Sequence, residues 1–184
     1  MEIHTPLRLL CNGVIDAWIG CHPDVPDEDD PELACFHLNR LPTHLVVAVD
    51  HPLLYLGDNI TLEDVRRYPS VALPNNAFPK VQRILQELGL WNLPLPVRRY
   101  SSDKWEGMMT QDFRVGYANS FTKHLFSSPH VVLPIDIPLE TGDTLVVPRA
   151  YVKHLRLLEL LAHLKGRAAI LADRFPEVRV AGDG

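Results

Sequence analysis

Short apolar runs alternate along most of the chain with segments in which apolar residues recur at helical spacing. Residues 45–49, Leu-Val-Val-Ala-Val, are typical of a buried strand. Val81, Ile84, Leu85 and Leu88 recur at the three- and four-residue spacing of a helix. Residues 61–64, Thr-Leu-Glu-Asp, have the form of a capping box that begins another helix. Strands alternating with helices predict an α/β architecture with largely parallel sheets.

In the last third of the chain, strand-like apolar runs are again followed by a segment with helical spacing. Residues 131–135 and 144–147 are each predicted to form a strand, and a final helix is predicted over 152–164. One side of that helix carries an apolar stripe made of Leu155, Leu158, Leu161 and Ala162. The stripe predicts either a core face or a dimer contact. Gly166 is predicted to interrupt the helix.

The order of these elements predicts two lobes. The chain leaves one α/β unit, builds a second, and returns to the first. We predict that lobe I comprises residues 1–46 and 144–184 and that lobe II comprises residues 47–143. Two passes of the chain between two lobes create a cleft, and clefts of this kind bind small ligands. The pattern therefore favours a sensor or binding protein.

Composition narrows the class of protein. The chain has 184 residues, 46% of them hydrophobic and 22% charged, and its formal net charge is −5, which is typical of a folded domain but not of a free-standing nucleic-acid binder. No apolar run is long enough to cross a bilayer, and no secretion signal is visible. The three cysteines are widely spaced, so we predict a cytoplasmic protein with reduced thiols.

Four segments, in order along the chain, resemble one protein family. Residues 10–20 are similar to the segment of LysR-type transcriptional regulators that reads leucine, two variable residues, glycine, variable, isoleucine or leucine, aspartate. Residues 45–53 resemble that family's strand ending in His-Pro-Leu, and residues 60–69 resemble its next helix. Residues 108–119 occupy the place of its helix, Gly-x-Gly turn and strand.

The resemblance implies an effector-binding domain with the type 2 periplasmic-binding-protein fold, in which two Rossmann-like subdomains are joined by two crossover strands. It implies that a small effector is held between the lobes and that the domain forms a homodimer or tetramer. It further implies that DNA is reached only through a helix-turn-helix domain absent from this chain, and that the full-length regulator acts on RNA polymerase. We expect no membrane partner.

The sequence departs from the family pattern in two respects. The helix-turn-helix, the linker helix and the first strand and helix of the effector domain are not in this sequence. Asp112 and Arg114 stand at the two turn glycines, and Asn119 stands at a following proline. Because glycine permits positive φ or close backbone approach, charged residues there predict an altered turn.

The candidate ligand contacts lie at helix beginnings and strand ends. Unpaired N–H groups at a helix N-terminus favour an anion, which points to Thr5 and to the serines at 101 and 102. The ends of strands in open α/β sheets face ligand crevices, and this rule points to the pairs at 21–22 and 74–75. The predicted ligand-binding residues are Thr5, Cys21, His22, Pro74, Asn75, Ser101 and Ser102.

The sequence predicts neither catalysis nor a cofactor. It has no GxSxG elbow, no HExxH pair and no glycine-rich phosphate loop, and Cys35 with His37 is too small a set for a metal site. We therefore predict a regulatory sensor that binds a small, anionic metabolite. Three alternatives stay open: a solute-binding protein of a transport system, a small enzyme on the same scaffold, and a degenerate relative that no longer senses.

Overall fold

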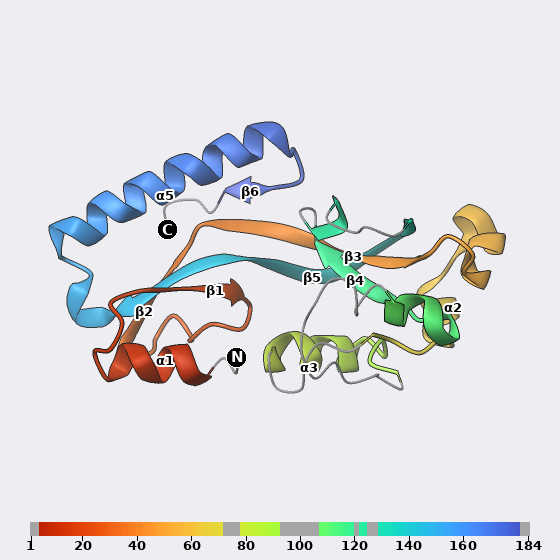
Figure 1. The fold of residues 1–184 in the computed structure, drawn as a ribbon, viewed down its shortest axis with the longest axis horizontal. Helices are drawn as coiled ribbons and strands as arrows, with labels where there is room; N and C mark the ends of the chain where they lie inside the picture. The colour runs from red at the N-terminus through yellow and green to blue at the C-terminus, as the bar shows by residue number, and fades with distance from the viewer. Residues whose placement is uncertain (1–3, 72–77, 93–106, 120–121, 125–128, 181–184) are drawn as a thin grey trace. The chain divides into compact units, whose positions relative to one another are not determined.

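The computed structural model describes residues 4–71, 78–92, 107–119, 122–124 and 129–180. The chain forms two compact units. Unit 1 contains Met1–Pro42 and Glu140–Gly184, and unit 2 contains Thr43–Leu139. The chain passes from one unit to the other twice, within strands β3 (Asn39–Ala48) and β5 (His130–Pro148) (Figure 1). The α/β class is confirmed.

The sheet of unit 1 is built around the second half of β5. Strands β1 (Trp18–His22) and β2 (Leu33–His37) flank it, and both run antiparallel to it. The two-residue strand β6 (Arg179–Val180) pairs antiparallel with the start of β3. The prediction of largely parallel sheets is therefore wrong for these strands. Strand β5 returns the chain from unit 2 and runs in the direction opposite to β1 and β2, so both ladders are antiparallel.

The helices α1 and α5 belong to unit 1. Helix α1 (His4–Cys11) ends before Gly13, whose φ of +65° suits glycine after the end of a helix. Helix α5 (Leu155–Arg174) packs Leu157 and Leu161 against apolar residues of β2 and β5. It continues through Gly166, so the predicted interruption there is wrong. A single glycine in a helix costs only about 1 kcal/mol relative to alanine.

Unit 2 joins short helices to the second half of β3, which begins at Thr43. They are the 3-10 helix η1 (Pro52–Asn59), α2 (Leu62–Val65) and α3 (Pro79–Glu87). The predicted capping box is confirmed, because Thr61 caps α2 and Asp64 bonds back to the Thr61 backbone. Strand β4 (Gly116–Asn119) pairs antiparallel with β3. The remaining 3-10 turns are η2 (Gln111–Phe113) and η3 (Thr122–His124) in unit 2, and η4 (Arg149–Tyr151) in unit 1.

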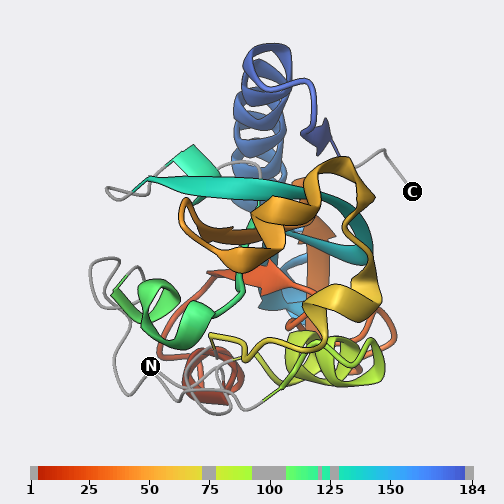
Figure 2. The same cartoon turned by 90° about the vertical axis from the view of Figure 1, so that its right-hand side faces the viewer.

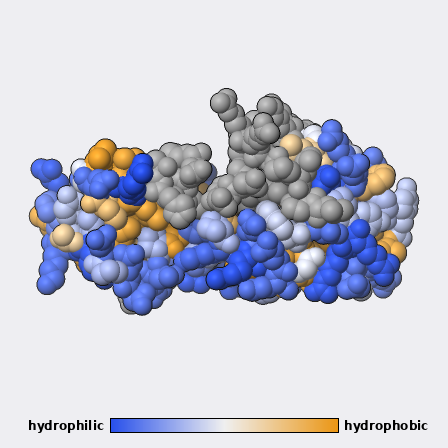
Figure 3. Space-filling model, turned by 90° about the horizontal axis from the view of Figure 1, so that it is seen from below, coloured by the Kyte–Doolittle hydropathy of each residue, from blue (hydrophilic) through white to orange (hydrophobic). Residues whose placement is uncertain are grey.

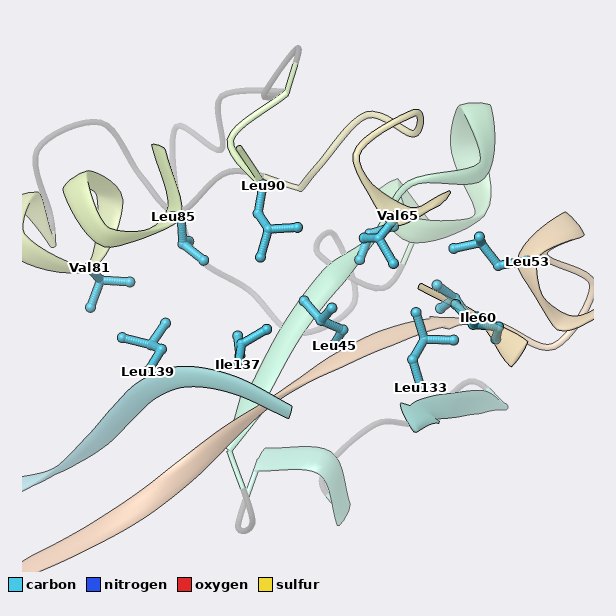
Figure 4. Packing of buried hydrophobic residues seen from close by; sticks show 12 residues of the cluster. Leu45, Leu53, Ile60, Val65, Val81, Leu85, Leu90, Leu133, Ile137 and Leu139 are labelled. Carbon is cyan, nitrogen blue, oxygen red and sulfur yellow. The ribbon is translucent and has the colours of Figure 1, made fainter. Parts of the chain in front are cut away.

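The core of unit 2 is a layer of aliphatic side chains between these helices and the strands (Figure 4). Leu45 of β3 and Leu85 of α3 are fully buried in it, and Leu53 of η1 is 1% exposed. Burying side chains of this size contributes about 1.5–3 kcal/mol each. The apolar spacing seen in the sequence of α3 therefore corresponds to a real core face.

Strands β3 and β5 approach each other closely where they lie in unit 1. The Asn39 side chain donates to the Asp143 carboxylate at 2.9 Å and accepts from the Asp143 backbone N–H at 2.9 Å. A Cβ atom added to Gly142 would lie 2.2 Å from the Asn39 carbonyl oxygen. Only glycine therefore fits at position 142.

A single arginine holds the acidic loop between β1 and β2. The Arg149 guanidinium donates to three backbone carbonyls of that loop region: to Asp30 at 2.8 Å, to Glu28 at 3.0 Å and to Leu33 at 2.9 Å. Its backbone N–H donates to the Glu32 carbonyl at 2.8 Å. The carboxylates of the loop are not the acceptors in these bonds.

The molecular face in Figure 3 is mostly hydrophilic, with smaller hydrophobic patches between the polar groups. Among the helices that the structure describes, none combines the length and apolar character needed for a membrane span.

Two leucines of η1 provide a matched test of the unit 2 core. Leu53 is 1% exposed, whereas Leu56 is 44% exposed. We expect Leu53→Ala to lower the free energy of unfolding by about 2–5 kcal/mol, because it leaves a cavity. Leu56→Ala should change it by less than about 0.5 kcal/mol. Urea denaturation of both variants measures the difference, and equal effects would contradict the placement of η1.

Candidate functional site

Polar side chains gather where β1 and β2 end beside β5 in unit 1. We call this set the strand-end cluster, and its members are Cys21, His22, His37, Asn39, Asp143 and Thr144. Cys21 lies opposite Asp143 in the register of β1 with β5, and His37 lies opposite Thr144 in the register of β2 with β5. The antiparallel ladders therefore bring two strand ends to one short stretch of β5.

The two histidines of the cluster contact each other. The rings of His22 and His37 lie edge to face, with centroids 5.1 Å apart. A hydrogen bond of 2.8 Å joins His37 Nδ1 to the Thr144 hydroxyl, and Thr144 is completely buried. His37 Nε2 lies 3.8 Å from a carboxylate oxygen of Glu28. These contacts fix the orientation of the His37 ring.

Burial is the largest cause of the pKa shifts of His37 and Cys21. Desolvation lowers the pKa of His37, and the Arg40 charge lowers it further, while Glu28 acts in the opposite direction. Burial also raises the pKa of the Cys21 thiol, and Asp143 and Asp24 add to that rise. The Cys21 thiol donates to the His22 carbonyl oxygen at 3.4 Å. The cluster thus offers a protonated thiol and a neutral imidazole, which suit hydrogen bonding better than nucleophilic attack.

The structure describes some of the residues that the sequence predicts as ligand contacts, and others lie outside its described part. Cys21 and His22 end β1 and lie together in the strand-end cluster. Thr5 lies in the first turn of α1, which begins at His4. Whether any of these residues binds a ligand stays a prediction. The same holds for the remaining four residues, which lie outside the described part of the chain: Pro74, Asn75, Ser101 and Ser102.

The sequence does not predict the remaining members of the cluster as ligand contacts; these are His37, Asn39, Asp143 and Thr144. It presents His37 only as a metal ligand beside Cys35. Within the described residues, no group of three or more His, Cys, Asp or Glu side chains is arranged to hold a metal ion. The alternation of His37 and Asn39 with apolar residues was the available signal, because residues two apart on a strand share a face.

A second polar arrangement lies in unit 2 around His51, which is 1% exposed. His51 Nδ1 accepts from the Leu53 backbone N–H at 3.1 Å, so Nε2 carries the proton and donates to the Phe113 carbonyl at 2.8 Å. The ring also packs against Tyr68, with centroids 4.6 Å apart. His51 therefore joins the start of η1 to the turn formed by η2, which ends at Phe113.

That turn has an unusual backbone. Asp112 has a φ of +55° and Phe113 a φ of +51°, whereas Arg114 is extended. The left-handed conformation expected at the two glycine positions of the family thus falls on Asp112 and Phe113, and not on Arg114. Arg114 stabilises the turn by donating to the Ser70 carbonyl at 3.1 Å and to the Asp112 carboxylate at 3.3 Å.

Comparison with known proteins extends these observations. The family model described as LysR substrate binding domain matches residues 2–169. Among curated proteins, none matches the sequence. Several solved structures share the fold.

Full-length BenM carrying the E226K mutation has a TM-score of 0.72 at 19% identity over 95% of this chain and 56% of that one. An OxyR C206 mutant from Corynebacterium glutamicum has a TM-score of 0.69 at 17% identity, covering 94% of this chain and 54% of that one. The BenM effector-binding domain with benzoate has a TM-score of 0.71 at 18% identity, covering 94% and 78%. The chain therefore has the periplasmic-binding-protein-like fold of these domains and spans about half the length of the full-length BenM and OxyR chains.

The buried His51 predicts a pH dependence of stability. Burial lowers the pKa of His51 in the folded state, so the unfolded chain takes up the proton first as pH falls. Stability should therefore be lost as pH falls below about 6.5, until the folded state is also protonated. His51→Asn should reduce this dependence, leaving the part that His37 contributes. Urea titrations between neutral and acidic pH measure it, and an unchanged slope in the variant would contradict the assignment.

The left-handed turn predicts an order of stability among variants at position 112. Asp112→Val should lower the free energy of unfolding by about 1–2 kcal/mol, because a β-branched residue is strained at positive φ. Asp112→Asn should change it by less than about 0.5 kcal/mol, since asparagine tolerates this conformation and the exposed carboxylate contributes little. Both variants lose the same ion pair, so denaturant unfolding isolates the backbone effect. Equal stabilities would rule out a left-handed Asp112.

Proposed function

The chain belongs to the LysR substrate binding domain family, and from this premise we propose that it senses a small-molecule effector for a transcriptional regulator. Binding would favour one of two conformations of the domain, and a ligand can shift such an equilibrium only by its difference in affinity. The domain would act on DNA, and on RNA polymerase, through a separate helix-turn-helix domain, in the cytoplasm and as a homodimer or tetramer. It would act by binding and not by catalysis.

The observation that carries this proposal is the strand-end cluster. It places Cys21, His22 and His37 on a rigid sheet, and each offers a polar group suited to orienting a small ligand. Buried or half-buried polar groups that converge in this way are typical of binding sites. Within the cluster, the Asn39 side chain bonds to Asp143, and the neighbouring Gly142 lets β5 lie close to the β3 backbone. We propose that units 1 and 2 are the two lobes of the effector domain.

We propose that the effector is an organic acid. The N-terminus of α1 in unit 1 favours negative charge. The BenM domain of the same fold was captured with benzoate as its effector. Asp24 and Asp143, which act on the Cys21 thiol, would favour an amine instead, so amines belong in the same screen.

A thermal-shift screen tests the proposal. We expect at least one aromatic or aliphatic carboxylic acid to raise the melting temperature in a concentration-dependent way, because a ligand that binds only the folded state stabilises it. His22→Ala should weaken the effect about tenfold or more in apparent dissociation constant, as expected when a hydrogen bond to a charged group is lost. His163→Ala, on the exposed face of α5, is the matched control and should leave it unchanged.

Two outcomes would count against the proposal. A response to amines alone would replace the organic acid by a cationic effector. No response to either class, together with no response by isothermal calorimetry, would favour the relative that does not sense.

A further inference from the structure

Helix α5 carries a row of exposed residues along the side that faces away from its own unit. Of its 20 residues, only Leu157, Leu161 and Ala168 are buried. In Figures 1 and 2, the strands of unit 1 lie on one side of α5, and the opposite side has no helix or strand of the described residues beside it. The exposed row follows an alternating four- and three-residue spacing, which places its members along one line of the helix. We call this row the cationic ridge, and its members are Arg156, Leu160, His163, Arg167, Ile170 and Arg174.

The cationic ridge combines positive charge with apolar surface. Leu160 is 40% exposed and Ile170 is 50% exposed, and both lie between arginines. The two acidic residues of α5, Glu159 and Asp173, lie off this line. The ridge is therefore a positively charged, partly apolar strip on a chain whose formal net charge is −5.

The three arginines of the ridge differ from most other arginines of the chain. Among the described residues, none forms a hydrogen bond or an ion pair with the side chain of Arg156, Arg167 or Arg174. Most arginines outside α5 do bond to a carboxylate or a backbone carbonyl. The ridge guanidinium groups are thus available to carboxylates of another molecule, which arginine binds through two parallel hydrogen bonds.

Arg156 stands where a cation does not help the helix. It lies in the first turn of α5, which contains no acidic residue, and the positive end of the helix dipole disfavours a cation there. Arg174 lies in the last turn, where a cation is favoured. Helix stability therefore accounts for Arg174 but not for Arg156, which indicates a role for the ridge outside its own unit.

We propose that the cationic ridge docks an acidic, amphipathic helix of another protein. Arg156, Arg167 and Arg174 would pair with its carboxylates, and its apolar side chains would cover Leu160 and Ile170. The ridge is straight, and Arg167 and Arg174 are two helical turns apart, so carboxylates two turns apart on a partner helix match them. This partner is distinct from the effector, and the inference goes beyond the proposed sensing of a small molecule.

Nucleic acid fits the ridge less well than an acidic helix does. Its phosphates would bind the arginines, but a phosphate backbone offers no apolar surface to Leu160 and Ile170. The net charge of −5 also opposes a long polyanion, because many phosphates act on the protein at once.

Fluorescence anisotropy with a synthetic helical peptide is the first test. This acidic probe carries leucines along one side and glutamates on both flanks of the leucines, and a second peptide has glutamine in place of each glutamate. We expect the full chain to bind the acidic probe, and to bind the glutamine peptide at least about tenfold more weakly, because the bonds to charged carboxylates are lost. Added salt should weaken binding of the acidic probe, since the ridge is exposed.

Arg156→Glu separates docking from folding. It should weaken binding of the acidic probe about fivefold or more, yet it should not lower the melting temperature, because glutamate suits the first turn of a helix. Combined with Arg167→Glu, it should weaken binding at least about tenfold, and a lysine version of the probe should bind this double variant instead. Arg83→Glu is the matched control, since the Arg83 side chain is 70% exposed on α3, and it should leave binding unchanged.

A pair of leucines tests the apolar part of the ridge. Leu160→Gln should weaken binding of the acidic probe about threefold or more, because an apolar contact at the interface is lost. Leu158→Gln is the matched control, since Leu158 is 51% exposed but lies off the ridge, and it should leave binding unchanged. Circular dichroism confirms that each variant keeps its helix.

Other results would overturn the proposal. Absence of binding by the acidic probe, or equal binding of the glutamine peptide, excludes an acidic helix as the partner. Equal effects of Leu160→Gln and Leu158→Gln reduce the ridge to a general attraction for anions. Duplex DNA or anionic vesicles that bind the ridge more tightly than the probe assign it to that class of partner, and self-association that Arg167→Glu abolishes assigns it to a second copy. None of these results depends on an effector, so they are distinguishable from a failure of the thermal-shift screen.

Discussion

The close contact between β3 and β5 at Asn39 and Gly142 is the constraint that the rest of the structure depends on. β3 carries the chain out of unit 1 and β5 brings it back. β5 supplies core residues to both units, and β3 supplies Leu45 and Val47 to the core of unit 2. The two hydrogen bonds between Asn39 and Asp143 set which residues lie side by side as the strands pass. A side chain at 142 would collide with the β3 backbone. Because β1 and β2 pair with the same stretch of β5, this contact also determines where the strand-end cluster forms.

Local signals in the sequence predicted the local elements well. The capping box at Thr61 and the apolar face of α3 depend on neighbours within a few residues, and both were confirmed. Glycines were harder to interpret. The sequence predicts two strands at 131–135 and 144–147, yet β5 is one strand of 19 residues, and its Gly142 permits the close approach to Asn39. Gly166 suggested a helix end, yet α5 continues. Spacing alone does not distinguish a glycine that ends an element from one that permits close packing.

The candidate site could be predicted only in part, because it is assembled by pairing across the sheet. Cys21 and His22 could be found from the rule that strand ends face ligand sites. The bond between His37 and Thr144 joins residues 107 positions apart, and no local pattern encodes such a contact. The turn at Asp112 is an intermediate case. The family resemblance indicated where positive φ was needed, but the structure transfers one of the two left-handed positions to Phe113.

The loop before β2 should respond to salt in two separate ways, because Arg149 holds it through its backbone and not through its carboxylates. The guanidinium reaches carbonyl oxygens, which carry no net charge, and not the carboxylates around them. Mobile counterions screen attraction between exposed ions far more than short hydrogen bonds in fixed geometry. The loop should therefore keep its backbone shape in concentrated salt while its acidic side chains lose most of their long-range field, so that shape and electrostatic potential respond independently to ionic strength.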